Sequence, residues 1–436
     1  MNDTLKEWKN KVLKNHKWNI TITILDGAFF FFGLGFVSEI TILPLFINKL
    51  TPYKSVVGLV TALWMFGFFA PQIISARLVE PLARKKRLVF LVGMGQRLPW
   101  LFLALATYFL IREGSLVGLF IFFVLYGFYA FSGGFNFVPW LDLMGKILLP
   151  KRRGRVLGFN RFAGGILGIV GALIAGRILG HLPFPNNFSL CFLLAFLMTS
   201  ISLAAFSFYR EPAYPVVKER MAWKVYFKGL GRILKKDKNY SYCLLANIIL
   251  CFVALATPFY ALYAIEKLGA PEGWIGIFTA LILGAQTITF VLWGYLGDRQ
   301  GYKGVMVLAA LFAGGAAVLA LLAGSIGLYL LVFVLLGFYM SAVMLGYMLI
   351  VLEFSPPEKR PTYIGLGHTI LALPLTIAPL LGGFLIDRIG YRFVFGLTAL
   401  VAFVSLSILI LVVKEPRRRY SFLTQMSTDN NTDEHR

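Results

Sequence analysis

Long apolar stretches recur from one end of this chain to the other, and they limit the possible folds more than any other feature. Of the 436 residues, 58% are hydrophobic, and the mean hydropathy is +0.76. Many stretches are long enough, at about 20 residues, for a helix to cross a hydrocarbon layer of roughly 30 Å. A membrane β-barrel would instead show segments of about ten residues with alternating polarity, and the sequence lacks this pattern. The sequence therefore predicts an all-α membrane protein.

The apolar stretches predict twelve transmembrane helices, numbered here helix 1 to helix 12. Their expected ranges are 19–48, 55–75, 88–111, 115–141, 156–180, 187–209, 241–265, 273–294, 304–323, 327–352, 362–387 and 391–413. The first 18 residues are too polar for a cleaved signal sequence, so we expect helix 1 to serve as an uncleaved signal anchor.

The net charge of +22 is spread unevenly along the chain. The N-terminus and the segments after the even-numbered helices carry 33 of the 42 Lys and Arg residues. Because positive residues accumulate on the cytoplasmic side of membrane proteins, this bias predicts a multi-pass inner-membrane protein with both termini in the cytoplasm. The basic surplus also suits contact with anionic headgroups of the lipid bilayer, and it gives no reason to expect nucleic-acid binding.

The chain divides into two similar halves around one long polar segment. We expect a six-helix bundle over 1–209, a basic cytoplasmic linker over 210–240, a second six-helix bundle over 241–413 and a cytoplasmic tail over 414–436. Residues 49–63 (KLTPYKSVVGLVTAL) resemble residues 267–281 (KLGAPEGWIGIFTAL) at an offset of 218. The ends of the halves, YREP (209–212) and VKEP (413–416), also echo each other. An even number of helices per half keeps the two copies parallel, as in a known transporter architecture.

The loop after helix 8 reads GYLGDRQGYK (294–303). With twelve spans and two halves, this motif resembles the major facilitator superfamily, whose loop signature is G-x-L-x-D-R-x-G-R/K-R/K. The resemblance covers the whole chain and implies a secondary transporter that works by alternating access, without identifying the substrate. The signature residues are Gly294, Leu296, Asp298, Arg299, Gly301 and Lys303. The corresponding loop after helix 2 departs from the signature and keeps Glu80, Arg84 and Lys85.

The resemblance also implies a gating role for these two loops. A carboxylate at a helix end can face the positive N-terminus of a neighbouring helix and so close the cytoplasmic side. We expect Asp298 to lie near the start of helix 5, within reach of Arg155 or Arg161. Its counterpart Glu80 should lie near the start of helix 11. The alternative to a gating role is that these loops only connect the helices.

Ionisable side chains inside the apolar spans are costly and therefore mark candidate functional positions. Helix 1 carries Asp26 and Glu39, which lie 13 residues apart and so, at roughly 220° of helix rotation, point to different faces. The resemblance places helix 1 beside the central cavity, so one acid is expected to serve the cavity and the other to pair with Arg97 of helix 3. The remaining coupling or substrate candidates are Asn136, Arg161, Asn247, Gln286 and His368.

Two further features concern the contact between the halves. Arg161 and His368 correspond at an offset of 207, and we expect them to face each other near the pseudo-twofold axis, where a histidine can titrate in the working range. Small residues recur at every fourth position of two helices, which predicts close packing of helix 5 against helix 8. These residues are Gly164, Gly168, Ala172 and Gly176 in helix 5, and Gly276, Ala280 and Gly284 in helix 8.

These features together predict a proton- or ion-coupled transporter of a small organic molecule. Acids in an aromatic-rich first helix favour export of amphipathic compounds. A proton-coupled nutrient or sugar symporter stays open as an alternative, as does a non-transporting membrane sensor or scaffold. The three cysteines and four histidines form no metal-binding spacing, and no phosphate-binding loop occurs. We therefore expect a monomeric protein that binds no metal or cofactor and has no enzymatic activity.

Overall fold

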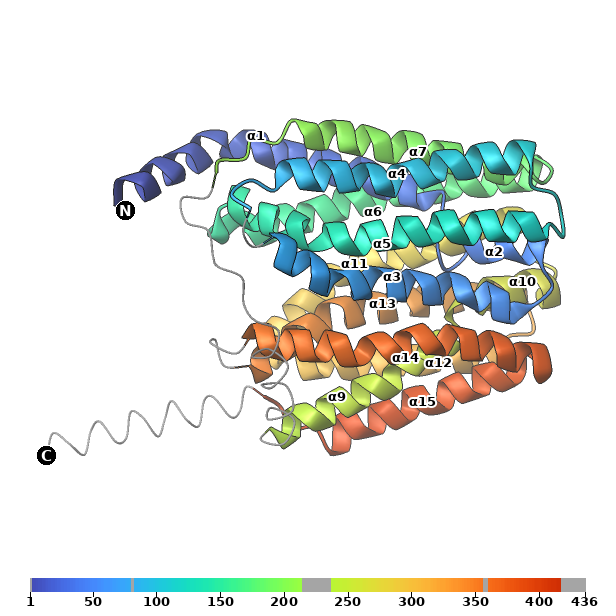
Figure 1. Ribbon diagram of the computed structural model, residues 1–436. Coiled ribbons are helices and arrows are strands. Elements are labelled where there is room, and N and C mark those ends of the chain that lie inside the picture. The colour runs from blue at the N-terminus through green and yellow to red at the C-terminus, as the bar shows by residue number, and fades with distance from the viewer. Residues whose placement is uncertain (1, 80–81, 214–236, 356–359, 417–436) are drawn as a thin grey trace, which may run out of the picture.

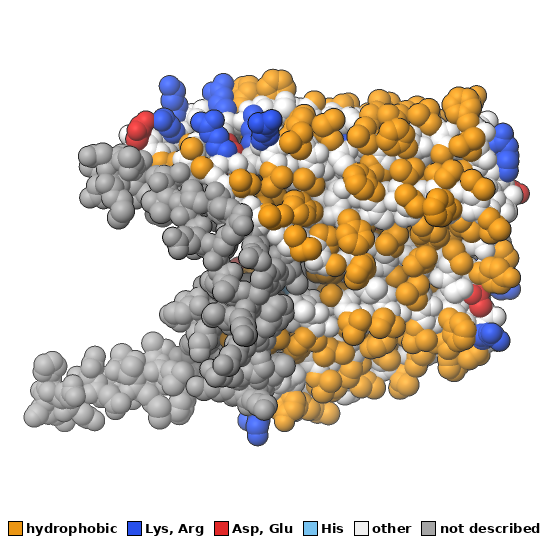
Figure 2. Space-filling model, viewed as in Figure 1, with side chains coloured by type: hydrophobic (Ala, Val, Ile, Leu, Met, Phe, Trp, Pro, Cys, Tyr) orange, Lys and Arg blue, Asp and Glu red, His pale blue; other side chains and the backbone are white. Residues whose placement is uncertain are grey.

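The computed structural model describes residues 2–79, 82–213, 237–355 and 360–416. The described residues form helices and contain no strand. Among them, twelve helical segments are long and apolar enough to cross a membrane, which confirms the predicted all-α membrane fold. Apolar side chains cover the middle of the surface seen in Figure 2, and charged side chains gather at the two ends. This band is what a hydrocarbon layer requires, since it cannot solvate charged groups.

The first bundle holds helices 1 to 6 (Figure 1). Its elements are α1 (Asn2–Gly35), α2 (Ile42–Leu50), α3 (Lys54–Val79), α4 (Lys86–Phe109), α5 (Leu116–Ile147), α6 (Pro150–His181) and α7 (Asn186–Ser207). Helix α1 packs against α6 and α7, whereas α5 packs against α3 and α4.

The second bundle repeats this arrangement with helices 7 to 12 (Figure 1). Its elements are α9 (Lys238–Cys251), η1 (Phe252–Leu255), η2 (Thr257–Phe259), α10 (Tyr260–Leu268), η3 (Glu272–Trp274), α11 (Ile275–Gln300), α12 (Tyr302–Leu322), α13 (Ile326–Phe354), α14 (Arg360–Arg388) and α15 (Tyr391–Leu411). The start of α1 and the end of α15 lie at the same end of the molecule, which we call the cytoplasmic end in accordance with the predicted topology.

Helices 1 and 7 are both interrupted, and this differs from the single spans predicted for them. Helix 1 ends at Gly35 and resumes at Ile42, and helix 7 passes through two short 3-10 turns before Tyr260. At the 218 offset the two interruptions coincide. Pro44 and Pro258 contribute because each lacks the N–H that would continue the helical hydrogen bonds. Irregular backbone inside a membrane is tolerated where protein or a cavity covers it, so these interruptions mark the middle of the molecule as a candidate site.

The bundles meet along two helix pairs, α3 with α14 and α6 with α11. The second pair confirms the predicted packing of helix 5 against helix 8. At Gly176 an added Cβ would lie 2.8 Å from the Cα of Gly276, so a side chain at either position would separate the helices. Small residues are therefore needed where these two helices cross.

Candidate functional site

The two acids of helix 1 occupy different surroundings. Asp26 is buried in the first bundle, where its Oδ1 accepts a 2.6 Å hydrogen bond from the hydroxyl of Ser202 on α7. The same hydroxyl lies 3.4 Å from Nη2 of Arg97, which is also buried. Ser202 therefore bridges the carboxylate of Asp26 and the guanidinium of Arg97.

Polar partners surround the rest of the Arg97 guanidinium. Nε donates to the carbonyl of Thr199, and Nη1 donates to the carbonyl of Gly93 and to Oε1 of Gln96. Gln96 Oε1 in turn accepts a 3.1 Å hydrogen bond from Asn136 of α5. Buried charges are tolerated when they are paired and hydrogen-bonded, and this network fulfils both conditions. Asn136, a predicted candidate, thus belongs to the network around Arg97.

Glu39 lies in the interruption of helix 1, between Gly35 and Ile42, and is half-buried. Its carboxylate lies within electrostatic range of Tyr126 and Tyr129 on α5. The Tyr126 hydroxyl and the indole N–H of Trp100 are buried and have no hydrogen-bond partner among the described residues. Since buried polar groups in proteins normally find a partner, this corner retains unused hydrogen-bonding capacity.

Aromatic rings line the first bundle next to Glu39. Trp100 packs against Tyr129 with ring centroids 4.7 Å apart, and Trp64 stacks on Tyr129 at 5.4 Å and on Phe68 at 5.5 Å. Trp64 and Phe68 are half-buried, so part of each ring is accessible. We call Trp64, Phe68, Trp100, Tyr126 and Tyr129 the aromatic wall.

The remaining candidates lie elsewhere. Arg161 is on α6 with its guanidinium 4.7 Å from the ring centroid of Phe31, whereas His368 on α14 contacts the rings of Phe69 and Tyr347. Helix α6 adjoins α11, and α14 adjoins α3, so Arg161 and His368 belong to different bundle contacts. Their predicted facing arrangement is not among the contacts of the described residues and stays a prediction.

Two neutral candidates of the second bundle bond locally. Asn247 donates to the carbonyl of Cys243 one turn earlier, and the amide of Gln286 lies 3.4 Å from the sulfur of Met340. The structure therefore brings Asp26, Arg97 and Asn136 into one network, and leaves Asn247 and Gln286 outside it.

The signature loop after helix 8 lies at the cytoplasmic end. Asp298 is exposed and accepts a 2.8 Å hydrogen bond from the Tyr302 hydroxyl. Gly301 has a φ of 90°, a conformation that residues with a side chain rarely adopt, so the loop needs glycine there. Lys303 points to the carbonyl of Ile410 at 3.4 Å. Gly294 and Arg299 lie on the last turns of α11, where Arg299 packs over the ring of Tyr295.

The loop after helix 2 is anchored within its own bundle. Glu80 lies outside the described residues, so its position near helix 11 stays a prediction, as does the approach of Asp298 to helix 5. Arg84 is exposed, whereas Lys85 forms an ion pair with Asp142. The backbone N–H of Lys85 donates to both carboxylate oxygens of Glu211, at 2.9 and 3.0 Å.

Sequence reasoning missed several charged residues that the structure shows to be important. Glu211 and Lys146 form a buried ion pair, and Lys54, Glu266 and Asp387 connect the two bundles. The repeated Glu-Pro of YREP and VKEP was a usable signal for Glu211. The two interfacial acids lie at helix ends, where a sequence alone does not show which helix is opposite.

Comparison with known proteins agrees with this architecture. The sequence profile of the Major Facilitator Superfamily matches residues 25–274 and also residues 242–426. The protein named multidrug resistance protein MdtG of Klebsiella pneumoniae (strain 342) is 30% identical over 167 residues, and that of Dickeya zeae (strain Ech586) is 32% identical over 169 residues. Each match covers 37% of this chain and 40% of the relative, so it spans about two fifths of the relatives' length.

Solved structures share the fold over nearly the whole chain. A bacterial homolog of the human lysosomal transporter Spinster, in an inward-facing and unoccupied conformation, has a TM-score of 0.69 at 13% identity and covers 92% of this chain and 98% of its own. A D-xylose–proton symporter also has a TM-score of 0.69, at 14% identity, over 91% of this chain and 98% of its own. Two copies of six helices, the signature loop and the family match lead to one conclusion: the chain belongs to the Major Facilitator Superfamily of membrane transporters and is a multi-pass protein of the inner membrane.

Proposed function

We propose that this transporter exports small amphipathic organic cations in exchange for protons. The observation that carries the proposal is the half-buried carboxylate of Glu39 on the interrupted helix 1, within electrostatic range of Tyr126 and Tyr129 of the aromatic wall. A carboxylate attracts a cationic group, and the faces of Trp and Tyr rings attract cations as well as apolar surface. Ligand sites commonly combine such apolar walls with a few polar groups that fix orientation.

The unpartnered polar groups of the wall support a ligand with one polar end. The Tyr126 hydroxyl and the Trp100 N–H are buried without a partner among the described residues, and the two rings are neighbours, with centroids 6.2 Å apart. A bound molecule or water that reaches this corner would satisfy them. The accessible parts of Trp64 and Phe68 would then contact the apolar portion of the molecule.

Proton exchange follows if a proton and a cationic substrate compete for Glu39. Protonation removes the charge that attracts the cation, and the cation in turn opposes protonation, so the two occupancies are linked. Asp26 has a different role in this proposal. Its bridge through Ser202 to Arg97 joins α1 to α4 and α7, and stabilises the wall that carries the site.

The relatives support export more than uptake. The two relatives described above are named multidrug resistance proteins, although each match covers 40% of the relative. The likeness to the sugar symporter is at 14% identity and concerns the fold alone. A proton-coupled sugar or nutrient symporter remains the alternative that the experiment must distinguish.

Transport in proteoliposomes tests the proposal. We expect an imposed proton gradient to drive accumulation of a fluorescent lipophilic cation by the wild-type protein, and Glu39→Gln to abolish this accumulation. Glu113→Gln is the matched control, because Glu113 is exposed in the turn between α4 and α5. Proton-driven uptake of a neutral sugar, without movement of the cation, would favour the symporter. Wild-type behaviour of Glu39→Gln would contradict the assignment of the site.

A further inference from the structure

The signature after helix 8 has a second copy in this chain, at the end of helix 11. Residues 383–392 read GFLIDRIGYR, against GYLGDRQGYK at 294–303. The two segments share two glycines, the leucine, the Asp-Arg pair and the tyrosine, and both end in a basic residue. The shared pairs are Gly294 and Gly383, Leu296 and Leu385, Asp298 and Asp387, Arg299 and Arg388, Gly301 and Gly390, and Tyr302 and Tyr391.

The two copies also adopt the same local structure. Gly301 and Gly390 have positive φ values of 90° and 110°, and each directly precedes the next helix. Each arginine packs its guanidinium over the aromatic ring four residues earlier, at 4.3 Å for Arg299 and 5.6 Å for Arg388. The two copies therefore share their backbone turn and arginine packing, but the Tyr302 hydroxyl donates to Asp298 of its own motif, whereas the Tyr391 hydroxyl donates to Glu266.

The copies lie at opposite ends of the molecule. Helix α11 runs toward the cytoplasmic end, whereas α14 runs in the opposite direction and ends at the other side (Figure 1). This follows from the helix order, since the first copy ends an even-numbered helix and the second an odd-numbered one. The predicted topology makes the second side extracellular.

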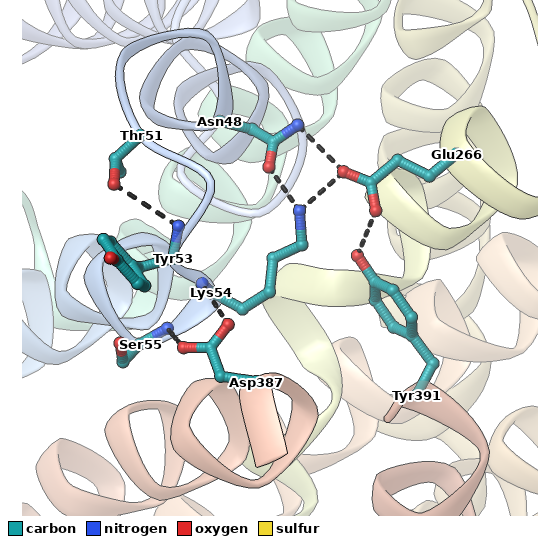
Figure 3. Close-up of polar contacts among 8 residues, drawn as sticks. All are labelled: Asn48, Thr51, Tyr53, Lys54, Ser55, Glu266, Asp387 and Tyr391. Atoms are coloured by element: carbon teal, nitrogen blue, oxygen red, sulfur yellow. Dashed lines mark hydrogen bonds and ion pairs between the residues drawn. The ribbon is translucent and has the colours of Figure 1, made fainter. Parts of the chain in front are cut away.

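At that extracellular end, Asp387 caps a helix of the other bundle. Its Oδ1 accepts a 2.8 Å hydrogen bond from the backbone N–H of Lys54, and its Oδ2 accepts one of 2.9 Å from the N–H of Ser55 (Figure 3). Lys54 is the first residue of α3, so the carboxylate lies at the positive end of that helix. Unsatisfied N–H groups and the helix dipole both favour an anion there.

The side chain of Lys54 is held as well as its backbone. Its Nζ lies 2.6 Å from Oε1 of Glu266 on α10 and 2.5 Å from Oδ1 of Asn48. Glu266 also accepts a 2.7 Å hydrogen bond from the hydroxyl of Tyr391, the tyrosine of the second copy (Figure 3). Two residues of the second copy thus hold the start of α3. Asp387 bonds to it directly, and Tyr391 acts through Glu266, which pairs with Lys54.

We propose that the second copy holds the extracellular side closed during the transport cycle, because Asp387 positions the start of α3 against α14. The capping bonds join α14 of the second bundle to α3 of the first, so the extracellular side cannot open between these helices until they break. Loss of the Asp387 charge would therefore shift the conformational equilibrium toward the outward-open state. The proposal rests on alternating access by this family and is independent of the substrate.

Thiol accessibility in lipid nanodiscs tests this proposal without any substrate. Thr41→Cys supplies the reporter, because Thr41 is buried between the bundles and its Oγ1 lies 2.6 Å from Oγ1 of Thr279 on α11. The three native cysteines are buried, and the protein without Thr41→Cys gives their background labelling by a polar maleimide. All variants are compared in the Thr41→Cys background. Asp387→Asn removes the charge but keeps one acceptor oxygen, and Asp387→Ala removes both.

We expect labelling to be about threefold faster with Asp387→Asn and about tenfold faster with Asp387→Ala, the latter equivalent to about 1.4 kcal/mol. Glu113→Gln, which neutralises an exposed acid in the turn between α4 and α5, is the control and should leave labelling unchanged. Equal labelling with and without Asp387→Asn would overturn the proposal. An equal acceleration by Glu113→Gln would also overturn it, since it would indicate general loosening. If Asp387→Ala does not fold, Asp387→Asn alone decides.

Discussion

The ammonium nitrogen of Lys146 lies 2.8 Å from Oε1 of Glu211, and both side chains are buried, with exposed fractions of 0% and 2%. Lys146 is on the last turn of α5, and Glu211 follows α7. The same carboxylate accepts hydrogen bonds from the N–H groups of Lys85 and Lys86 at the start of α4. Glu211 alone therefore connects the cytoplasmic ends of α4, α5 and α7.

We expect Glu211→Ala to destabilise the protein strongly. The change leaves the charge of Lys146 buried and the N-terminus of α4 uncapped, and breaking a buried ion pair typically costs about 3–5 kcal/mol. The midpoint of thermal unfolding in detergent measures this loss. Glu7→Ala is the control, since Glu7 forms an exposed ion pair with Lys11 and exposed pairs contribute about 0–1 kcal/mol. An unchanged midpoint for Glu211→Ala would contradict the anchoring role.

The glutamates of the YREP and VKEP segments occupy corresponding places in the two bundles. The carboxylate of Glu415 lies against Gly301 at the start of α12, as Glu211 lies against the start of α4. Glu353, at the end of α13, lies 3.3 Å from the N–H of Tyr302. The repeated glutamate thus lies at the start of the third helix of each half and caps α4, whereas the N–H of Tyr302 at the start of α12 donates to Glu353.

The pairing of Arg97 leads to a second prediction. Arg97→Leu leaves the carboxylate of Asp26 buried without the positive charge that stabilises it, so we expect loss of folded protein and of thermal stability. Neutralising the partner acid in Asp26→Asn/Arg97→Leu should restore part of the stability. The control pair Glu39→Gln/Arg97→Leu should restore none, because Glu39 lies next to the wall tyrosines instead. Equal rescue by both acid changes would show that the pairing through Ser202 is not specific.

The number of membrane helices, their approximate positions and the packing of helix 5 against helix 8 could be predicted, whereas the interruptions of helices 1 and 7 and the partners of single charges could not. Hydropathy over 20 residues averages out local detail, and the duplicated sequence requires the two bundles to be alike. The interruption of helix 1 was missed because Pro44 lies within an apolar run, although Ser38 and Glu39 gave a polar signal. Which acid meets Arg97 depends on the packing of α7, which brings Ser202 between Asp26 and Arg97. No spacing along the chain contains that information.

The orientation of the chain in the membrane is a third prediction. We expect cysteines introduced at Ser115 and Gly327 to react with a membrane-impermeant maleimide added to intact cells. Ser115 precedes α5 and Gly327 is in the first turn of α13, both at the end opposite the start of α1. Cysteines at Pro215 and Ser421, in the basic linker and tail, should react after the cells are opened. The reverse pattern would show that the Lys and Arg bias does not set the topology here.

The aromatic wall gives the last prediction, which tests the substrate class by affinity. Trp64→Ala removes an accessible ring that stacks on Tyr129, next to Glu39. A cation–π contact contributes about 0.5–2 kcal/mol, so the dissociation constant of a lipophilic cation should rise by roughly 2- to 30-fold. Phe66→Ala is the matched control on the same helix, because 50% of Phe66 is exposed and its ring packs on Phe131 at the surface. Fluorescence titration of purified protein measures both. If Trp64→Ala binds the cation as tightly as the wild type and Phe66→Ala do, the aromatic wall only contributes to packing within the bundle. The cation must then bind elsewhere.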